Sequence, residues 1–199
     1  MIRPIPSSLH NLRQDQLGTA IVEFALIAPL FFMILLVLVD FAYRGYAISR
    51  VDGTLEQAVR MATVGNKTET QIDDFVRNRL TQFNPNATVS ITKSNYYQFS
   101  NVAKSEKLIT DSAPLGVWNT GDCYEDLNNN GKWDTVAGRD GMGGSDDIIF
   151  YKVDYTFKRV VPLAGLLGWS NNQTVSSNTV MRNQPYAVQS IPIQKCTSS

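Results

Sequence analysis

The sequence has almost no histidine, little cysteine and no net charge. Its single histidine, His10, stands near the N-terminus, so Ser-His, Cys-His and His-rich metal chemistry lack a residue to carry them. Lysine and arginine together number 18, as do aspartate and glutamate, and this balance does not suggest a nucleic-acid partner. The composition therefore argues against an enzyme, and neither a nucleic acid nor a small-molecule substrate is expected as a partner.

The two cysteines, Cys123 and Cys196, belong to no CxxC pair and have no histidine nearby, so a zinc site is not expected. In an exported domain they would form a disulfide that ties the C-terminal tail to an acidic segment. The alternative is a pair of unrelated free thiols.

One long apolar run, residues 20–39, carries a single charge, Glu23. A helix of this length spans the ~30 Å hydrocarbon core of a bilayer, and Pro29 is tolerated in a membrane helix. A secretory signal peptide would have a shorter apolar core and a small-residue cleavage site behind it, which residues 40–44 do not supply. The run therefore predicts a membrane anchor. A carboxylate within it is expensive in hydrocarbon and indicates a function.

The helix is expected to continue beyond the membrane, from about Ala20 to Val64, with Gly65-Asn66 as its stop. Spacings of three and four residues predict a narrow apolar stripe that packs against the rest of the protein. The stripe consists of Ile48, Val51, Leu55, Ala58 and Ala62.

The orientation in the membrane does not follow from charge, because two arginines precede the span and two follow it. Globular-looking sequence lies only on the C-terminal side, and residues 1–18 resemble a leader peptide. We therefore expect the N-terminus in the cytoplasm, a transmembrane and amphipathic helix over 19–64, and a periplasmic domain over 65–199.

The C-terminal domain is predicted to be α+β. Thr68 and Gln71 form a capping box for a short amphipathic helix that stops at residues 84–86. Period-two alternation then predicts antiparallel strands at about residues 89–99, 148–160 and 174–182.

The stretch from Asp122 to Asp147 has seven acidic and two basic residues, which favours a cation. Within it lies the pattern D-x-[DN]-x-[DN]-G-x-x-D of an EF-hand-type calcium loop, which predicts a structural Ca²⁺. Its ligands would be Asp126, Asn128, Asn130, the carbonyl of Lys132, and Asp134. Ala137 stands where the bidentate acid is expected, and the substitutes would be Glu125, Asp140, Asp146 or Asp147. The alternative is a polar turn in which Asn and Gly supply positive φ.

The N-terminal pattern resembles that of type IV pilins, and most closely the TadE-like pseudopilins of the Tad (tight adherence) pilus. The resemblance rests on G-T-A-I-V-E-F-A-L-I-A-P-L from Gly18, then D-F-A-Y, then the helix R-V-D-G-T-L-E-Q-A-V-R-M-A. The later stretches D-L-N-N-N-G-K-W-D, D-D-I-I-F-Y, V-P-L-A-G-L-L-G-W and V-M-R-N-Q-P-Y are also similar to those of TadE-like proteins.

The resemblance implies that a prepilin peptidase cuts between Gly18 and Thr19, so that Glu23 becomes the fifth mature residue and faces the free amine of an adjacent subunit. A carboxylate and an ammonium buried in lipid are tolerable when they pair. The implied partners are other pseudopilins and the inner-membrane assembly platform, and the implied role is pilus biogenesis, adherence and secretion.

Two other interpretations stay open. The chain is either an uncleaved single-pass protein, whose Glu23 reaches the membrane surface and whose periplasmic domain binds calcium or a partner, or a membrane-tethered hydrolase that uses acids of residues 122–147. The apolar segment 161–169 either contacts a partner or the membrane, or packs into the core.

Overall fold

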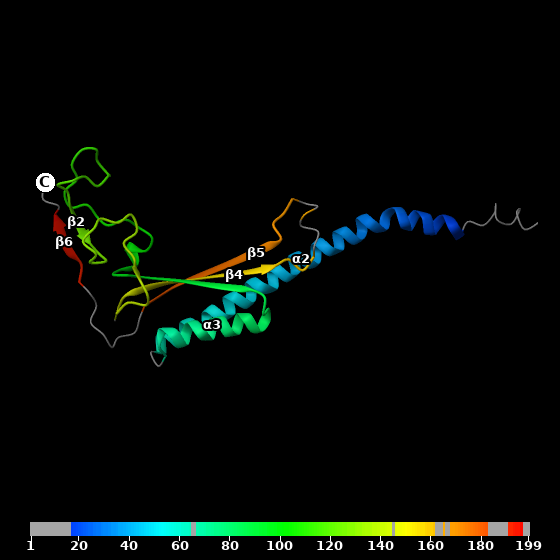
Figure 1. Ribbon diagram of the computed structural model, residues 1–199. Helices are drawn as coiled ribbons and strands as arrows, with labels where there is room; N and C mark the ends of the chain where they lie inside the picture. Colours follow the sequence, from blue (N-terminus) through cyan, green and yellow to red (C-terminus); the bar gives the residue numbers. More distant parts are fainter. Residues whose placement is uncertain are drawn as a thin grey trace, which may run out of the picture.

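The computed structural model describes residues 17–64, 67–144, 146–161, 165, 168–182 and 191–196. Most of the expected leader, the Gly65-Asn66 stop and much of the apolar segment 161–169 lie outside these residues. Two helices, α2 (Leu17–Val64) and α3 (Glu69–Phe83), precede all the strands in the chain (Figure 1). The strands are β1 (Thr88–Tyr96), β2 (Cys123–Asp126), β3 (Arg139–Asp140), β4 (Ile148–Lys158), β5 (Asn172–Arg182) and β6 (Ile193–Cys196), with a short 3₁₀ helix η1 (Phe99–Asn101) after β1.

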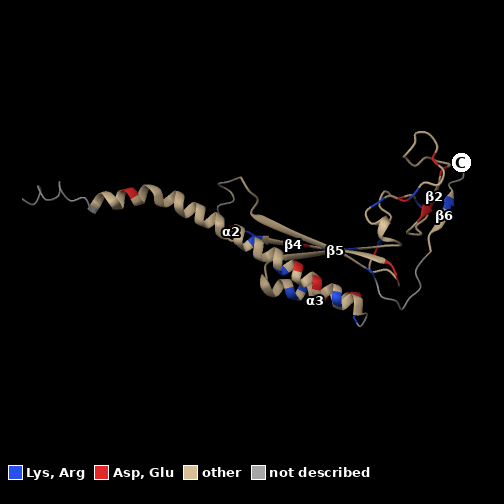
Figure 2. Ribbon diagram, turned by 180° about the vertical axis from the view of Figure 1, so that it is seen from behind, with Lys and Arg blue, Asp and Glu red and all other residues tan. Residues whose placement is uncertain are grey.

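Helix α2 has 48 residues, so it is about 72 Å long at 1.5 Å per residue. Its N-terminal half extends away from the sheet, and among the described residues it is the one helix long and apolar enough to cross a membrane (Figure 1). No part of that apolar window is buried by the rest of the chain. Charged residues gather instead on the half of α2 that lies along the sheet (Figure 2). The predicted long helix is confirmed, with Pro29 inside it.

The C-terminal half of α2 buries a stripe against the sheet, and the prediction of this stripe was wrong at one position. Ile48 is exposed and Ala47 is fully buried in its place. The stripe therefore advances in steps of four, four, three and four residues, which is the drift of a straight helix with 3.6 residues per turn. Its members are Ala47, Val51, Leu55, Ala58 and Ala62.

Helix α3 begins at the predicted capping box. The Thr68 side chain accepts a hydrogen bond from the backbone N–H of Gln71 (3.3 Å), and the Gln71 side chain accepts one from the backbone N–H of Thr68 (3.1 Å). Together they satisfy two N–H groups that have no partner within the helix. The buried face of α3 consists of Ile72, Val76 and Leu80.

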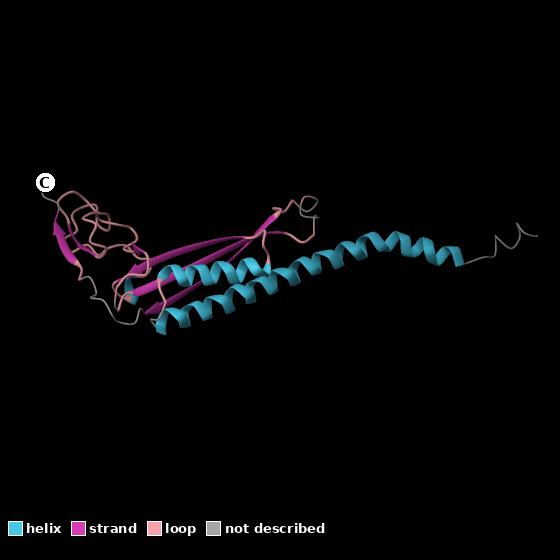
Figure 3. Cartoon of the chain, turned by 60° about the horizontal axis from the view of Figure 1, so that its bottom comes forward, coloured by secondary structure: helices cyan, strands magenta, loops and turns pink. Residues whose placement is uncertain are grey.

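The main sheet is antiparallel with the strand order β3-β1-β4-β5, and both helices cover one face of it (Figure 3). The three predicted strands correspond to β1, β4 and β5, which confirms the α+β fold. Strand β1 ends at Tyr96, before the predicted Phe99, which lies in η1. Alternate residues of β4 pack onto the helices because successive side chains point to opposite faces. They are Ile149, Tyr151, Val153, Tyr155 and Phe157.

A second, two-stranded sheet of β2 and β6 lies at the end of the molecule farthest from the apolar half of α2 (Figure 1). Neither strand, nor the two-residue β3, was predicted from the sequence. All four residues of β6 are exposed, so this strand has no apolar alternation to detect. Its partner β2 lies about 70 residues earlier in the chain.

Candidate functional sites

The predicted processing site lies on the first turns of α2. Gly18, Thr19 and Glu23 are all exposed there, and a Cβ added at Gly18 would meet no atom within 4 Å. Thr19 and Glu23 are four residues apart, so they lie on the same side of the helix one turn apart. Among the described residues nothing pairs with the Glu23 carboxylate. The first turns are therefore open to contact from another molecule.

A buried ion pair joins α2 to the sheet directly after the apolar run. Asp40 is buried, and its carboxylate pairs with the guanidinium of Arg159 in the β4–β5 connection. The Gln173 amide of β5 donates a further hydrogen bond to the same oxygen (3.0 Å). Sequence reasoning did not single out this cluster. Its only signal is an acid placed immediately behind an uncharged run.

Aromatic rings surround this junction. Tyr43 of α2 stacks on Phe83 of α3 (5.6 Å between centroids) and meets Phe157 of β4 edge-on (5.2 Å). Phe41 meets Trp169 edge-on at 6.2 Å, and the Arg159 guanidinium lies over the Trp169 ring at 5.1 Å from its centroid. Such pairs add to the burial of the rings themselves, so the helix is held to the domain from two sides.

The structure brings together the side chains of the predicted calcium loop, residues 126–134, which we call the Asx loop. The two carboxylate oxygens of Asp126 accept the backbone N–H groups of Asn130 (3.1 Å) and Gly131 (2.8 Å). The amides of Asn128 and Asn130 both donate to Oδ2 of Asp134 at 2.6 Å. Asn130 Oδ1 also accepts the backbone N–H of Lys132 (2.7 Å).

Glu106 supports the Asx loop and was missed in the sequence, where it stands in no recognisable pattern. It is buried, and its carboxylate accepts the backbone N–H groups of Leu127 (2.8 Å) and Asp134 (3.1 Å). Its backbone carbonyl accepts the indole N–H of Trp133 (3.1 Å). Burial raises the pKa of this carboxyl above its usual range, against the opposing effect of these hydrogen bonds.

The acids expected to replace the missing calcium ligand are distributed elsewhere. Asp147 accepts the backbone N–H of Gly144 (2.7 Å), and Asp146 lies 3.8 Å from the Arg182 side chain. Asp140 belongs to β3 and Glu125 to β2. Within the described part of the chain, no group of three His, Cys, Asp or Glu side chains is arranged to hold a metal ion. Calcium binding at the Asx loop stays a prediction.

A disulfide joins Cys123 of β2 to Cys196 of β6. The two residues are directly opposite each other in the register of the second sheet, although 73 positions separate them in the sequence. The bond fixes the C-terminal strand to the acidic segment that contains the Asx loop.

Comparison with known proteins identifies the N-terminal part of the chain. Residues 18–62 match the family model of the TadE-like proteins. Neither a curated protein nor a solved structure matches the chain. The matched residues comprise the apolar segment, the Asp40 junction and the stripe that packs under the sheet. The match over residues 18–62 is consistent with a membrane-anchored, TadE-like component of a Tad pilus system.

Proposed function

We propose that this protein is a minor pseudopilin of a Tad-type pilus assembly or secretion system. A prepilin peptidase removes residues 1–18, and helix 19–64 remains in the inner membrane with the C-terminal domain in the periplasm. The processed helix assembles side by side with the helices of other pseudopilins on the inner-membrane platform. The protein thereby acts in pilus biogenesis and adherence, without an enzymatic activity of its own.

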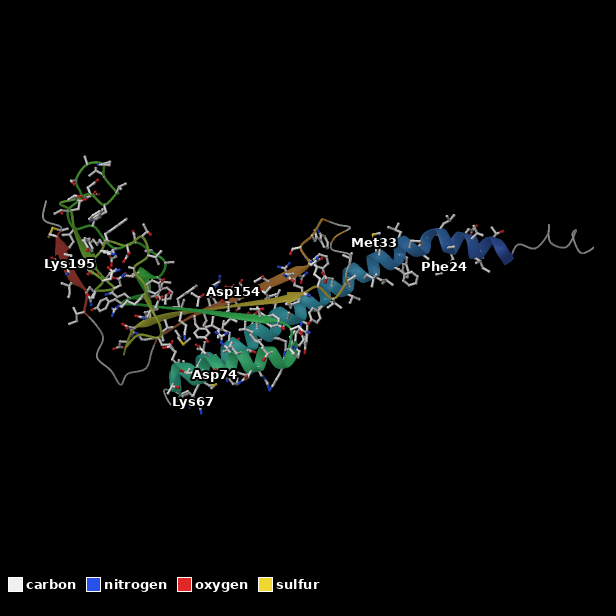
Figure 4. The ribbon with its side chains drawn as sticks, viewed as in Figure 1. Phe24, Met33, Lys67, Asp74, Asp154 and Lys195 are labelled. Carbon is white, nitrogen blue, oxygen red and sulfur yellow. A yellow bond between two sulfur atoms is a disulfide. The ribbon has the colours of Figure 1, made fainter. Side chains whose placement is uncertain are left out.

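The observation that carries this proposal is the unburied apolar half of α2. Phe24 and Met33 project from it beyond the reach of the sheet (Figure 4), and none of the apolar window is covered by the chain itself. So large an apolar surface needs a bilayer or other helices around it. The match of residues 18–62 to TadE-like proteins supports a pilus system as its setting.

Glu23 supports assembly between subunits. In a bilayer its carboxylate is costly unless a cation pairs with it, and the described residues supply none. Cleavage before Thr19 would create an ammonium one helical turn away from Glu23. Two parallel neighbours shifted along their axes can then pair the amine of one with the carboxylate of the other.

Two acids of residues 122–147 already accept hydrogen bonds from within the chain, and this supports a role other than hydrolysis. Asp122 accepts the backbone N–H and the hydroxyl of Ser112 (2.9 and 2.6 Å) and the backbone N–H of Asn119 (2.8 Å). Hydrogen bonds from Ser112 lower the pKa of this carboxyl. Asp126 is likewise occupied by backbone N–H groups. A hydrolase of the two-carboxylate type needs one acid and one base that are free to act on substrate.

The proposal is tested by the intact mass of the membrane-extracted protein, expressed with and without an active prepilin peptidase. We expect a chain that begins at Thr19 only when the peptidase is active, and an uncut chain when Gly18→Phe blocks the site. Glu23→Gln is the matched variant that should be cut normally and yet fail to co-purify with other pseudopilins. A wild-type chain that keeps its leader under both conditions would overturn the proposal in favour of an uncleaved single-pass anchor.

We also propose that the Asx loop takes a structural Ca²⁺. Oxygen-bearing side chains are the ligands that calcium prefers. The side chains of Asn128, Asn130 and Asp134 already lie together, and the two amides, which donate to Asp134 Oδ2, would turn their oxygens toward the ion when it binds. Calcium at ten times the Kd should stabilise the wild-type protein by about 1.4 kcal/mol, which is measured as a higher thermal midpoint. Magnesium at the same concentration serves as the ionic control, and an Asp134→Ala variant should not respond to calcium. An equal response of both proteins would contradict the site.

A further inference from the structure

The β4–β5 connection lies at the end of the sheet nearest the apolar half of α2 (Figure 1). Residues 160–169 contain no charged side chain. At the two ends of this stretch, two described side chains remain open to solvent: Val160 is 51% exposed and Trp169 is 40% exposed. Phe41 of α2, which meets Trp169 edge-on, is 54% exposed. We call Phe41, Val160 and Trp169 the apolar tip.

The apolar tip lies at the level where α2 leaves the hydrocarbon. The apolar run 20–39 ends at Val39, and its twenty residues of helix measure ~30 Å, the thickness of the core. Asp40, the next residue, is held by Arg159, which immediately precedes Val160 in the chain. The ion pair and the contact between Phe41 and Trp169 therefore fix the tip beside the membrane boundary.

The chemistry of the tip matches that boundary. Tryptophan is enriched at both membrane–water interfaces because its ring is apolar and its N–H is polar. Arg159 is neutralised by Asp40, so it brings no unpaired charge to the surface. Lys158, on the sheet side of the tip, is exposed and can face anionic lipid phosphates.

We propose that the apolar tip inserts into the interfacial layer of the same membrane that α2 crosses. This inference rests on the membrane anchoring in the proposed function. Continuity with the span favours lipid over a protein partner, because Phe41 lies on the helix only two residues beyond Val39. The domain then has two attachments to the membrane, the helix and the tip, and its tilt and rotation are fixed before assembly.

The test uses the full chain in nanodiscs of phosphatidylethanolamine and phosphatidylglycerol, with and without bromine on the acyl chains near the headgroup. The protein has three tryptophans. The W118F/W133F variant leaves Trp169 as the only fluorophore, whereas W133F/W169F leaves Trp118, which lines a cavity with Tyr124 of the distal strand β2. Bromine should quench Trp169 and leave the emission of Trp118 unchanged. Equal emission of Trp169 in brominated and ordinary lipid would overturn the inference.

A matched pair of substitutions checks the tip itself. Val160 and Val180 are both exposed valines of the β4–β5 hairpin, but Val180 lies near the opposite end of β5. Val160→Glu should abolish the quenching of Trp169, and Val180→Glu should preserve it. Equal quenching in the two variants would count against the tip as a lipid contact. Failure of the protein to enter nanodiscs would instead overturn the proposed membrane anchoring, so the two failures are distinguishable.

Discussion

The buried pair between Asp40 and Arg159 should be a principal attachment of α2 to the domain. In Arg159→Met the stem of the side chain is kept and the guanidinium is lost, so Asp40 retains only the hydrogen bond from Gln173. Removing one partner of a buried ion pair costs about 3–5 kcal/mol, because the other charge is left buried. The Arg159 side chain is 16% exposed, which argues for the lower end, ~3 kcal/mol.

Further variants separate the energy of the ion pair itself from the contributions of its two side chains. Asp40→Asn keeps an acceptor for Gln173 and leaves Arg159 with partial access to water, so we expect a loss of ~1–2 kcal/mol. The double variant removes both charges and should be more stable than the two single losses predict, with a coupling energy of at least ~1.5 kcal/mol. Lys152→Met is the control, because the Lys152–Asp154 pair is exposed at its lysine (39%) and should contribute less than ~1 kcal/mol.

The assay is urea unfolding of the full chain in detergent micelles, followed by near-ultraviolet circular dichroism of the aromatic rings around the junction. The free energy of unfolding is compared among wild type, the two single variants, the double variant and the control. A loss in Arg159→Met no larger than in Lys152→Met would refute the reasoning, as would single losses that simply add in the double variant.

Three further outcomes are expected. The Tyr155 hydroxyl is buried without a partner among the described residues, and burial raises its pKa to about 12, so Tyr155→Phe should gain up to ~1 kcal/mol in urea unfolding. Replacing Cys123 and Cys196 by serine should cost on the order of 4 kcal/mol for a separation of 73 residues, measured as the difference between the oxidised wild type and the variant. Hydrogen bonds from Ser112 lower the pKa of the Asp122 carboxyl in the folded protein. The ionised carboxylate therefore stabilises the fold above its usual pKa of 3.8, and this stabilisation is lost as the pH falls below 3.8. In a curve of unfolding free energy against pH, Asp122→Asn should flatten the acid side.

Local patterns in the sequence were enough to predict the elements that carry their own signals. The apolar run and the apolar stripe that follows it predict α2. The Thr68 capping box gives the start of α3 within a residue. Strand β4 alternates cleanly from Ile149 to its end and could be placed from its period alone. The error at Ile48 arose because a strict three-four spacing describes a coiled-coil seam, whereas a sheet contacts a broader helical face.

Features that depend on distant partners could not be predicted in this way. Strand β6 exists as a strand because β2 pairs with it, and all four of its residues are exposed, so it has no buried face of its own to indicate a strand. Glu106 is buried because the backbone N–H groups of the Asx loop meet its carboxylate, about 20 residues further along the chain. Asp40 reaches Arg159 across 119 positions. In each case the physical cause is a long-range contact, and single-sequence periodicity contains no information about such contacts.

The two acids near the ends of the apolar run, Glu23 within it and Asp40 directly after it, differ in how they are satisfied. Asp40 is paired within its own chain by Arg159 and Gln173, so a neighbouring subunit has nothing to add at that level of the helix. Glu23 has no such partner among the described residues and lies where water is scarce if α2 spans a bilayer. Of these two acids, only Glu23 can therefore gain a charge partner from a neighbouring subunit. In the proposed assembly, neighbouring helices recognise each other near their N-termini, about one helical turn inside the cytoplasmic boundary of the membrane, while the Asp40 junction keeps each domain in a fixed position on its own helix. Substitutions at Asp40 should then reduce the stability of the monomer, and substitutions at Glu23 should reduce only association.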